Sequence, residues 1–303
     1  MGPVFEDDRS LQAARTLGKR HVQGIVADTH LGQPRGIALS TSASSSRSTA
    51  GPPLVALRNV AKTFANGVEA LAGLDLEVRP GEFVSLLGPS GCGKSTALRL
   101  IAGLSEPSGG TIAWGRGAAP RARDIGFVFQ EPTLIPWTTV ARNVAVPLSL
   151  RHARAGDAAA RVAAALARVG LSDFRHAYPR ELSGGMKMRV SIARALATDA
   201  DLLLMDEPFA ALDEITRHKL NNDLLDLWQA LEKTVVFVTH SVFESVYLSG
   251  RIVVMTPRPG RVFKELAIDA PYPRDERFRT SAEYAAACRR VAEALAAAMD
   301  AAA

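Results

Sequence analysis

The stretch that decides the fold reads Phe83-Val84-Ser85-Leu86-Leu87-Gly88-Pro89-Ser90-Gly91-Cys92-Gly93-Lys94-Ser95-Thr96. Its apolar start predicts a buried strand, and the residues from Thr96 to Ile101 predict a helix. The loop between them fits the pattern G-x-x-x-x-G-K-[ST], in which glycines let successive backbone N–H groups converge on phosphate oxygens. The helix N-terminus behind the loop adds its positive dipole end to the same anion. The stretch therefore predicts a nucleotide-binding loop.

Within this loop, Lys94 is expected to reach the β- and γ-phosphates and the Ser95 hydroxyl to ligate Mg²⁺. Cys92 is interpreted as a small loop residue and not as a nucleophile, because no histidine is close to it in sequence. The expected nucleotide contacts are Gly88, Pro89, Ser90, Gly91, Cys92, Gly93, Lys94, Ser95 and Thr96. The loop alone does not tell which class of nucleotide-binding protein contains it.

The composition predicts a globular protein that spans no membrane by itself. Of the 303 residues, 47% are hydrophobic, which is enough for a packed core. The longest apolar runs are far shorter than the ~18 residues that a bilayer-spanning helix needs. The 36 basic and 31 acidic residues are interspersed, which indicates that they are ordinary solvent-exposed side chains. We therefore expect no nucleic-acid partner, although the net charge is +5. The two cysteines make no disulfide framework and suit a reducing compartment.

The chain divides into three predicted parts. Residues 1–53 carry mixed charges and a Ser/Ala-rich run without apolar periodicity, which predicts a disordered extension. Residues 54–264 form the predicted nucleotide-binding domain, with a helical insert at about 131–197. Residues 265–303 form a C-terminal extension whose alanine-rich end predicts a helix.

Inside the central part, short apolar strands alternate with helices. The segments at 54–57 and 70–78 flank the turn Asn66-Gly67 and predict strands joined by a hairpin-type connection. Further strands are expected at 111–114, 125–129, 202–205, 234–238 and 251–255, and helices at 140–150, 157–169, 186–197, 214–231 and 242–248. This alternation predicts an α/β fold with a mainly parallel sheet that is covered on both faces.

The strand Leu202–Met205 ends in two adjacent carboxylates, Asp206 and Glu207. Asp206 is placed to hold Mg²⁺ through its water shell. Glu207 is placed to orient or deprotonate the attacking water, because phosphoryl transfer needs charge neutralisation and an in-line nucleophile. Without the phosphate loop, the two residues would be interpreted as the ordinary polar end of a strand.

A second possible anion site is Ser183-Gly184-Gly185, which opens the helix that continues from Lys187. Such a helix start offers free N–H groups, although Ser-Gly-Gly is also a common helix cap. The chain thus has two predicted phosphate-binding helix starts but one loop lysine.

Taken in order, these motifs resemble the nucleotide-binding subunit of ATP-binding cassette (ABC) transporters. The resemblance covers about residues 54–263 and includes the loop 88–95, Gln130, the signature 182–186, the strand 202–206, Glu207, the D-loop Ala211-Leu212-Asp213 and the switch residue His240. It implies a P-loop NTPase (RecA-like) core with an antiparallel β subdomain and a helical subdomain.

The resemblance also implies roles for individual residues. Ser183, Gly184 and Gly185 of one subunit would contact the γ-phosphate held by the loop of another, so the active unit would be a head-to-tail dimer that closes over two ATP molecules. Gln130 would sense Mg²⁺ and the γ-phosphate, while its loop touches a membrane subunit. Lys94, Gln130, Glu207 and His240 form the implied catalytic set, with His240 bonding the γ-phosphate. Ser95, Gln130 and Asp206 are the implied metal ligands, and Phe64 and Asp213 further nucleotide contacts.

Within the family, the segments 134–137, 205–213 and 258–261 are most similar to ATPases that power bacterial uptake of nitrate, sulfonates and taurine, and 241–247 resembles members linked to pyrimidine-type solutes. This implies an integral-membrane permease, a periplasmic solute-binding protein and a place at the cytoplasmic face of the inner membrane. The alternatives are an exporter subunit and a soluble ABC ATPase that is not coupled to transport. A P-loop GTPase or kinase is disfavoured, because Ser183-Gly184-Gly185 has no place there and no N-K-x-D element occurs.

Overall fold

The computed structural model describes residues 51–115, 125–151 and 154–301. Residues 1–50 of the predicted extension lie outside the described part of the chain. None of the described helices combines the length and apolar character needed to cross a bilayer.

The central element is a six-stranded sheet in the order β5-β6-β7-β3-β8-β9. Neighbouring strands run parallel, except that β9 is antiparallel to β8. The mainly parallel sheet expected from the sequence is thereby confirmed. The strands are β3 (Phe83–Leu87), β5 (Ile125–Val128), β6 (Leu202–Asp206), β7 (Thr234–Thr239), β8 (Arg251–Met255) and β9 (Val262–Ala267).

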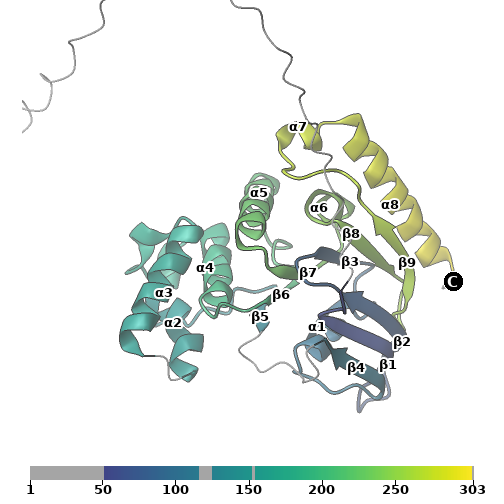
Figure 1. The fold of residues 1–303 in the computed structure, drawn as a ribbon, viewed down its shortest axis with the longest axis horizontal. Helices are drawn as coiled ribbons and strands as arrows, with labels where there is room; N and C mark the ends of the chain where they lie inside the picture. Colours follow the sequence, from purple (N-terminus) through teal and green to yellow (C-terminus); the bar gives the residue numbers. More distant parts are fainter. Residues whose placement is uncertain (1–50, 116–124, 152–153, 302–303) are drawn as a thin grey trace, which may run out of the picture. The chain divides into compact units, whose positions relative to one another are not determined.

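Side chains of the central strands alternate between two separate hydrophobic cores, as the two-residue period of a strand requires. In β3, Phe83 and Leu87 belong to one core, together with apolar residues of α5 (Glu214–Leu231), α6 (Val242–Leu248) and α8 (Ala282–Asp300). Val84 and Leu86 belong to the other core, with α1 (Lys94–Ile101) and the small sheet described next. Figure 1 shows these two layers on opposite faces of the sheet. Burial on both faces explains why the central strands are mostly apolar on both faces.

The small sheet is antiparallel and three-stranded, in the order β2-β1-β4. Its strands are β1 (Val55–Thr63), β2 (Glu69–Val78) and β4 (Gly109–Trp114). Thr63 pairs with Glu69 across the turn at Asn66-Gly67, so the hairpin expected there is confirmed. Inward-facing residues of β1 and β2, such as Leu57 and Leu74, share the core that contains α1.

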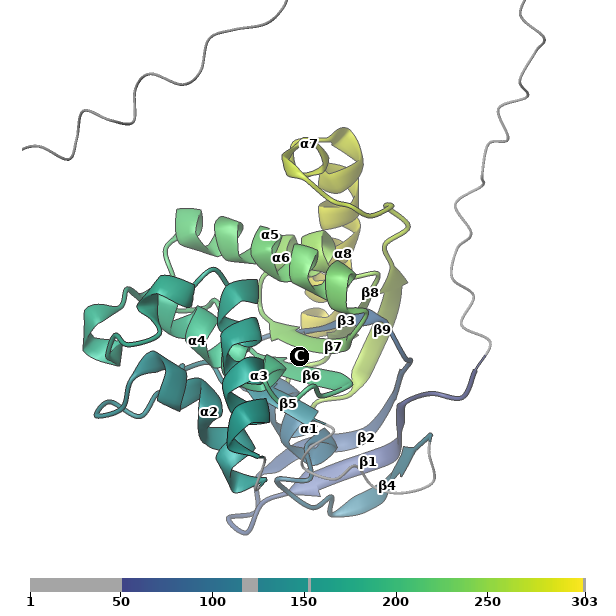
Figure 2. The same cartoon turned by 60° about the vertical axis from the view of Figure 1, so that its left-hand side comes forward.

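A group of helices adjoins the edge strand β5. It consists of α2 (Val140–Leu150), α3 (Ala155–Arg168) and α4 (Gly184–Leu196), with short 3₁₀ turns at Ser172–Phe174 and Pro179–Glu181. The three helices pack on one another and α4 also contacts β5 (Figure 2). Their apolar faces continue the core that lies under α5 and α6.

Beyond β9, α8 packs against α6, and the short helix α7 (Glu276–Arg279) packs against α8. Arg274 precedes these helices and is 4% exposed. Its guanidinium group donates to five backbone carbonyl oxygens, those of Val246, Tyr247, Ser249, Ile268 and Ala270, at 2.8–3.2 Å. The first three lie at the C-terminal end of α6, where helix carbonyls lack partners within the helix. Arg274 therefore ties the C-terminal segment to the end of α6.

Two elements of this region, β9 and α7, were not expected from the sequence. β9 has a mostly exposed burial pattern and carries Lys264 and Glu265, so it lacks the alternation that would reveal it. Edge strands are often charged in this way, because charge hinders pairing with other chains.

Replacing Arg274 should destabilise the fold strongly. In Arg274→Ala the five carbonyl oxygens lose their buried donor, and we expect the free energy of unfolding in urea to fall by about 2–4 kcal/mol. Arg277→Ala is the matched control, because Arg277 is exposed on α7. A loss in Arg274→Ala no larger than in Arg277→Ala would contradict the role of Arg274.

Candidate active site

The P-loop (residues 88–95) connects β3 to α1, as expected from the sequence. Gly91 and Gly93 have φ angles of 76° and 104°, which favour glycine. A Cβ atom at Gly93 would lie 2.7 Å from the backbone oxygen of Ala70 on β2. The second glycine therefore serves both the backbone conformation and the close approach of β2 to the loop.

The Lys94 ammonium group lies inside the loop, and its side chain is 3% exposed. It donates to the backbone oxygens of Gly88 and Pro89 at 2.8 and 2.9 Å and lies 3.6 Å from Glu207 Oε1. These partners compensate the burial of the positive charge. The lysine is thus already aimed into the loop in which phosphate would bind.

Two carboxylates lie at the end of β6, opposite the P-loop. The Ser95 hydroxyl donates to Asp206 Oδ1 at 2.7 Å, and Glu207 Oε2 lies 3.1 Å from Nδ1 of His240. The register of the sheet explains why these residues lie close together. Asp206 of β6 pairs with Val238 of β7, and the next residue of β7, Thr239, pairs with Leu87 of β3. The carboxyl ends of β3, β6 and β7 are level, so the residues that follow them converge.

The surroundings change the acidity of several groups. Burial raises the pKa of Asp206, although the hydrogen bond from Ser95 lowers it. Burial also raises the pKa of the Cys92 thiol, which argues against a thiolate nucleophile in the loop. The carboxyl of Asp213 has a lowered pKa, because it accepts a hydrogen bond from the backbone N–H of Thr216.

The signature residues lie on another element, the N-terminus of α4. Ser183 is exposed, and its Oγ accepts a hydrogen bond from the backbone N–H of Met186, as a helix cap does. A Cβ atom at Gly185 would lie 2.7 Å from Thr216 Cγ2, so this glycine allows α4 to approach the start of α5. Ser183 takes no part in the hydrogen bonds and ion pairs that join Lys94, Ser95, Asp206, Glu207 and His240 among the described residues.

Of the remaining predicted residues, Phe64, Gln130 and Asp213 are exposed and Thr96 is half-buried. Phe64 directly follows β1, is 41% exposed and has Lys62 Nζ 5.5 Å from its ring centroid. Gln130 is exposed at the bend after β5, and Asp213 caps α5 from an exposed position. Thr96 is half-buried in the first turn of α1. Exposure leaves the phenylalanine ring and the glutamine amide accessible to a ligand or a partner chain.

Two charged residues of the site were missed by the sequence reading. Arg217 Nη2 donates to the Leu212 carbonyl oxygen at 2.9 Å, and its Nε lies 3.7 Å from Glu244 Oε1. Thr239 donates to Glu244 Oε2 at 2.5 Å, and burial raises the pKa of Glu244. The pair thus connects the D-loop to the residues around His240. Arg217 and Glu244 each lie in the first turn of a helix. Charged residues are common at such positions, so the sequence alone does not indicate that these two form a pair.

A cavity of ≈10 Å³ lies beside the catalytic candidates and is lined by Glu207, Ala210, Arg217, Thr239, His240, Ser241 and Glu244. This volume is about the space that one water molecule needs. Its lining includes both ends of the contact between Glu207 and His240.

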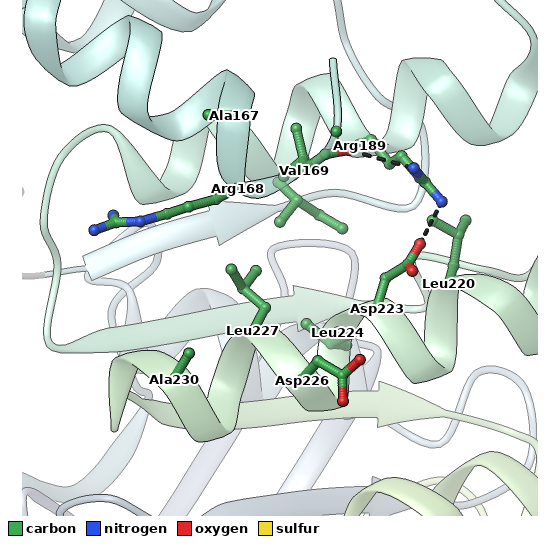
Figure 3. A pocket seen from close by; sticks show the side chains of 12 residues that line it. Ala167, Arg168, Val169, Arg189, Leu220, Asp223, Leu224, Asp226, Leu227 and Ala230 are labelled. Atoms are coloured by element: carbon green, nitrogen blue, oxygen red, sulfur yellow. Dashed lines mark hydrogen bonds and ion pairs between the residues drawn. The ribbon is translucent and has the colours of Figure 1, made fainter. Parts of the chain in front are cut away.

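A larger cavity, of ≈430 Å³, lies elsewhere, between the end of α3, α4 and α5. Figure 3 shows its apolar wall of Val169, Leu224 and Leu227 and, at one side, Arg189, which bonds Asp223 and the Val169 carbonyl oxygen. None of the predicted site residues lines it. This cavity is therefore separate from the predicted site residues.

Comparison with known proteins assigns the family. The ABC transporter family model matches residues 71–210. An ABC transporter ATP-binding protein of Methanocaldococcus jannaschii, itself uncharacterized, is 49% identical over 232 residues, which is 75% of this chain and 86% of the relative. This chain belongs to the ABC transporter ATP-binding proteins. It is an ATP-hydrolysing subunit.

Further relatives of this ABC ATP-binding protein include the aliphatic sulfonates import ATP-binding protein SsuB of Bacillus subtilis. That relative is 44% identical over 222 residues, 73% of this chain and 85% of its own. The dimeric ATP-binding cassette MJ0796, solved in a post-hydrolysis state with ADP and Pi, has a TM-score of 0.63 and 35% identity, over 72% of this chain and all of its own. The structure of cbiO1 of Clostridium perfringens, part of the ABC transporter complex cbiONQ, matches with a TM-score of 0.65 and 26% identity. The match covers 72% of this chain and 89% of cbiO1.

Proposed function

We propose that this ABC ATPase energises uptake of a small solute through ATP-driven closure of a head-to-tail homodimer against a separate permease. The supporting observation is that the two helix N-termini predicted to bind anions are separate. Lys94 begins α1 and lies 3.6 Å from Glu207, whereas Ser183 caps α4 and is exposed. A second copy can then present Ser183, Gly184 and Gly185 to the γ-phosphate. The proposed nucleotide-binding domain is 54–264, with its helical subdomain at about 131–197 and a C-terminal extension at 265–303.

In the proposed reaction, ATP binds along the P-loop from Gly88 to Thr96, and the adenine stacks on Phe64. Lys94 exchanges the carbonyl oxygens of Gly88 and Pro89 for phosphate oxygens, which are stronger acceptors because they are charged. Glu207 takes the proton of the attacking water, and His240, 3.1 Å away, bonds the γ-phosphate and orients the carboxylate. Gln130 and Asp213 complete the site from the exposed rim.

The donor set also fits Mg²⁺, which prefers oxygen ligands. The Ser95 hydroxyl and the Asp206 carboxylate meet at 2.7 Å, and Gln130 adds an amide oxygen on a neighbouring loop. When bound, the ion would neutralise charge on the transferred phosphate. Ser95, Asp206 and Gln130 are its proposed ligands.

The direction of transport and the solute class are inferred from the relatives. SsuB proteins of Bacillus subtilis and Bacillus cereus, at 42–44% identity, are named for import of aliphatic sulfonates. We propose a solute of the nitrate, sulfonate and taurine type, with a pyrimidine-type solute as the second option. The cargo would reach the permease through a periplasmic binding protein, and this ATPase would work at the cytoplasmic face of the inner membrane.

Purification from membranes tests the coupling to transport. Affinity purification of the full chain from detergent-solubilised cells should bring down a polytopic permease in stoichiometric amount. Recovery of the chain without a permease would favour the soluble ABC ATPase instead.

Glu207→Gln separates ATP binding from hydrolysis. Because the carboxylate serves the water and not the nucleotide, this variant should bind ATP with wild-type affinity. Its hydrolysis rate should fall by about 10²-fold or more. ATP should then trap a dimer, visible by analytical ultracentrifugation, whereas wild type with ADP stays monomeric. Hydrolysis at the wild-type rate would remove Glu207 from the proposed role.

A further inference from the structure

The turn between β8 and β9 (residues 256–261) lies directly against the outer side of the P-loop. A Cβ atom at Gly260 would lie 2.0 Å from the backbone oxygen of Cys92. At the other end of the loop, a Cβ atom at Gly88 would lie 3.2 Å from the backbone oxygen of Met255. The two segments therefore touch backbone to backbone, although more than a hundred residues separate them in sequence.

This turn is held in place by hydrogen bonds to β2 and by hydrogen bonds within the turn itself. Gly260 donates to the Ala70 oxygen at 2.9 Å and accepts from the Ala72 N–H at 3.2 Å, so β2 anchors it. Within the turn, the Thr256 hydroxyl donates to the Pro259 oxygen at 3.2 Å and accepts from the Arg261 N–H at 3.0 Å. The turn is thus a fixed support on which the P-loop rests.

Arg258 extends from this support to the most permissive part of the loop. Its Nε donates to the backbone oxygen of Gly91 at 3.2 Å. Gly91 and Gly93, on either side of Cys92, both have positive φ, and glycines allow the peptide units between them to rotate. The hydrogen bond from Arg258 fixes the orientation of one of these units.

The fixed unit carries an N–H that faces the opposite way. In a trans peptide the C=O of Gly91 and the N–H of Cys92 point in opposite directions, so an outward carbonyl turns that N–H inward. The Cys92 N–H indeed points to the Pro89 oxygen at 3.4 Å, the same oxygen that accepts from Lys94 Nζ at 2.9 Å. The N–H and the ammonium group converge on one acceptor, where a phosphate oxygen would replace the carbonyl.

We propose that Arg258 is a positioning residue for the nucleotide phosphates: by holding the Gly91 carbonyl outward, it keeps the Cys92 N–H directed into the P-loop. Its positive charge behind the loop adds to the attraction of the anion. This inference rests on the proposed phosphate-binding role of the P-loop. It gives a function to the Arg258-Pro259-Gly260-Arg261 segment, which ATP hydrolysis alone leaves unexplained.

Nucleotide affinity tests the inference. Arg258→Ala should raise the dissociation constant for ADP, measured by titration calorimetry, about threefold to tenfold, the loss expected for an exposed charge-assisted hydrogen bond. The affinity for ATP, measured in a Glu207→Gln background, should fall by the same factor, because the loop binds phosphates that both nucleotides share. KM for ATP should rise while kcat stays within about twofold. Arg258→Lys should recover most of the affinity.

Two control variants separate the possible failures. Arg261→Ala removes an exposed cation from the same turn and should leave the affinity unchanged. Lys94→Ala should abolish binding; if it does not, the proposed P-loop site itself is wrong. Suppose instead that Lys94→Ala loses binding but Arg258→Ala keeps the affinity of wild type or of Arg261→Ala. The inference about Arg258 is then overturned, and the proposed function stands. The same holds if Arg258→Ala lowers the affinity for ATP but not for ADP.

Discussion

The burial of one ammonium group organises the candidate active site of this ABC ATPase. Lys94 is almost inaccessible to solvent, and its charge is compensated by the oxygens of Gly88 and Pro89 and by Glu207 at 3.6 Å. A buried cation without such partners would be costly, so the loop geometry and the carboxylate position depend on each other. The neutral carbonyls are acceptors that a charged phosphate can displace. The site is therefore preorganised, with its lysine held where phosphate is expected to bind.

The sheet supplies the other half of this arrangement. Because β3, β7 and β6 are adjacent and parallel, with Leu87 opposite Thr239 and Val238 opposite Asp206, the residues after these strands meet at one edge. Two hydrophobic cores, one on each face, fix the strands against slipping by a residue, since a slip would exchange their buried faces. Support from outside comes from β2 and from the β8–β9 turn, which contact the loop at Gly93 and Cys92.

Much of this could be predicted from the sequence because it is local. The P-loop glycines, the mostly apolar strands and the Asn66-Gly67 turn each carry a physical requirement within a few residues. The ion pair of Arg217 with Glu244 and the contact of Arg258 with Gly91 join segments that are distant in sequence, and nothing near either arginine indicates its partner. The charged strand β9 was not predicted for a related reason. Its strand conformation depends on pairing with β8, and its own sequence lacks the alternation of apolar and polar residues that would indicate a strand.

The central proposal is that each ATP site is built from two copies of the chain. In one copy, Ser183 caps α4 and takes no part in the described contacts that join Lys94 to Glu207 and His240. A C₂ dimer that pairs the P-loop of each copy with the α4 N-terminus of the other would complete two equivalent sites.

The most direct test mixes two inactive variants, Lys94→Ala and Ser183→Glu, and measures ATP hydrolysis. A mixed dimer contains one complete site, made from the P-loop of the Ser183→Glu copy and the signature residues of the Lys94→Ala copy. Random pairing should then restore up to about a quarter of the wild-type rate. A mixture no more active than the two variants measured separately would contradict the shared site.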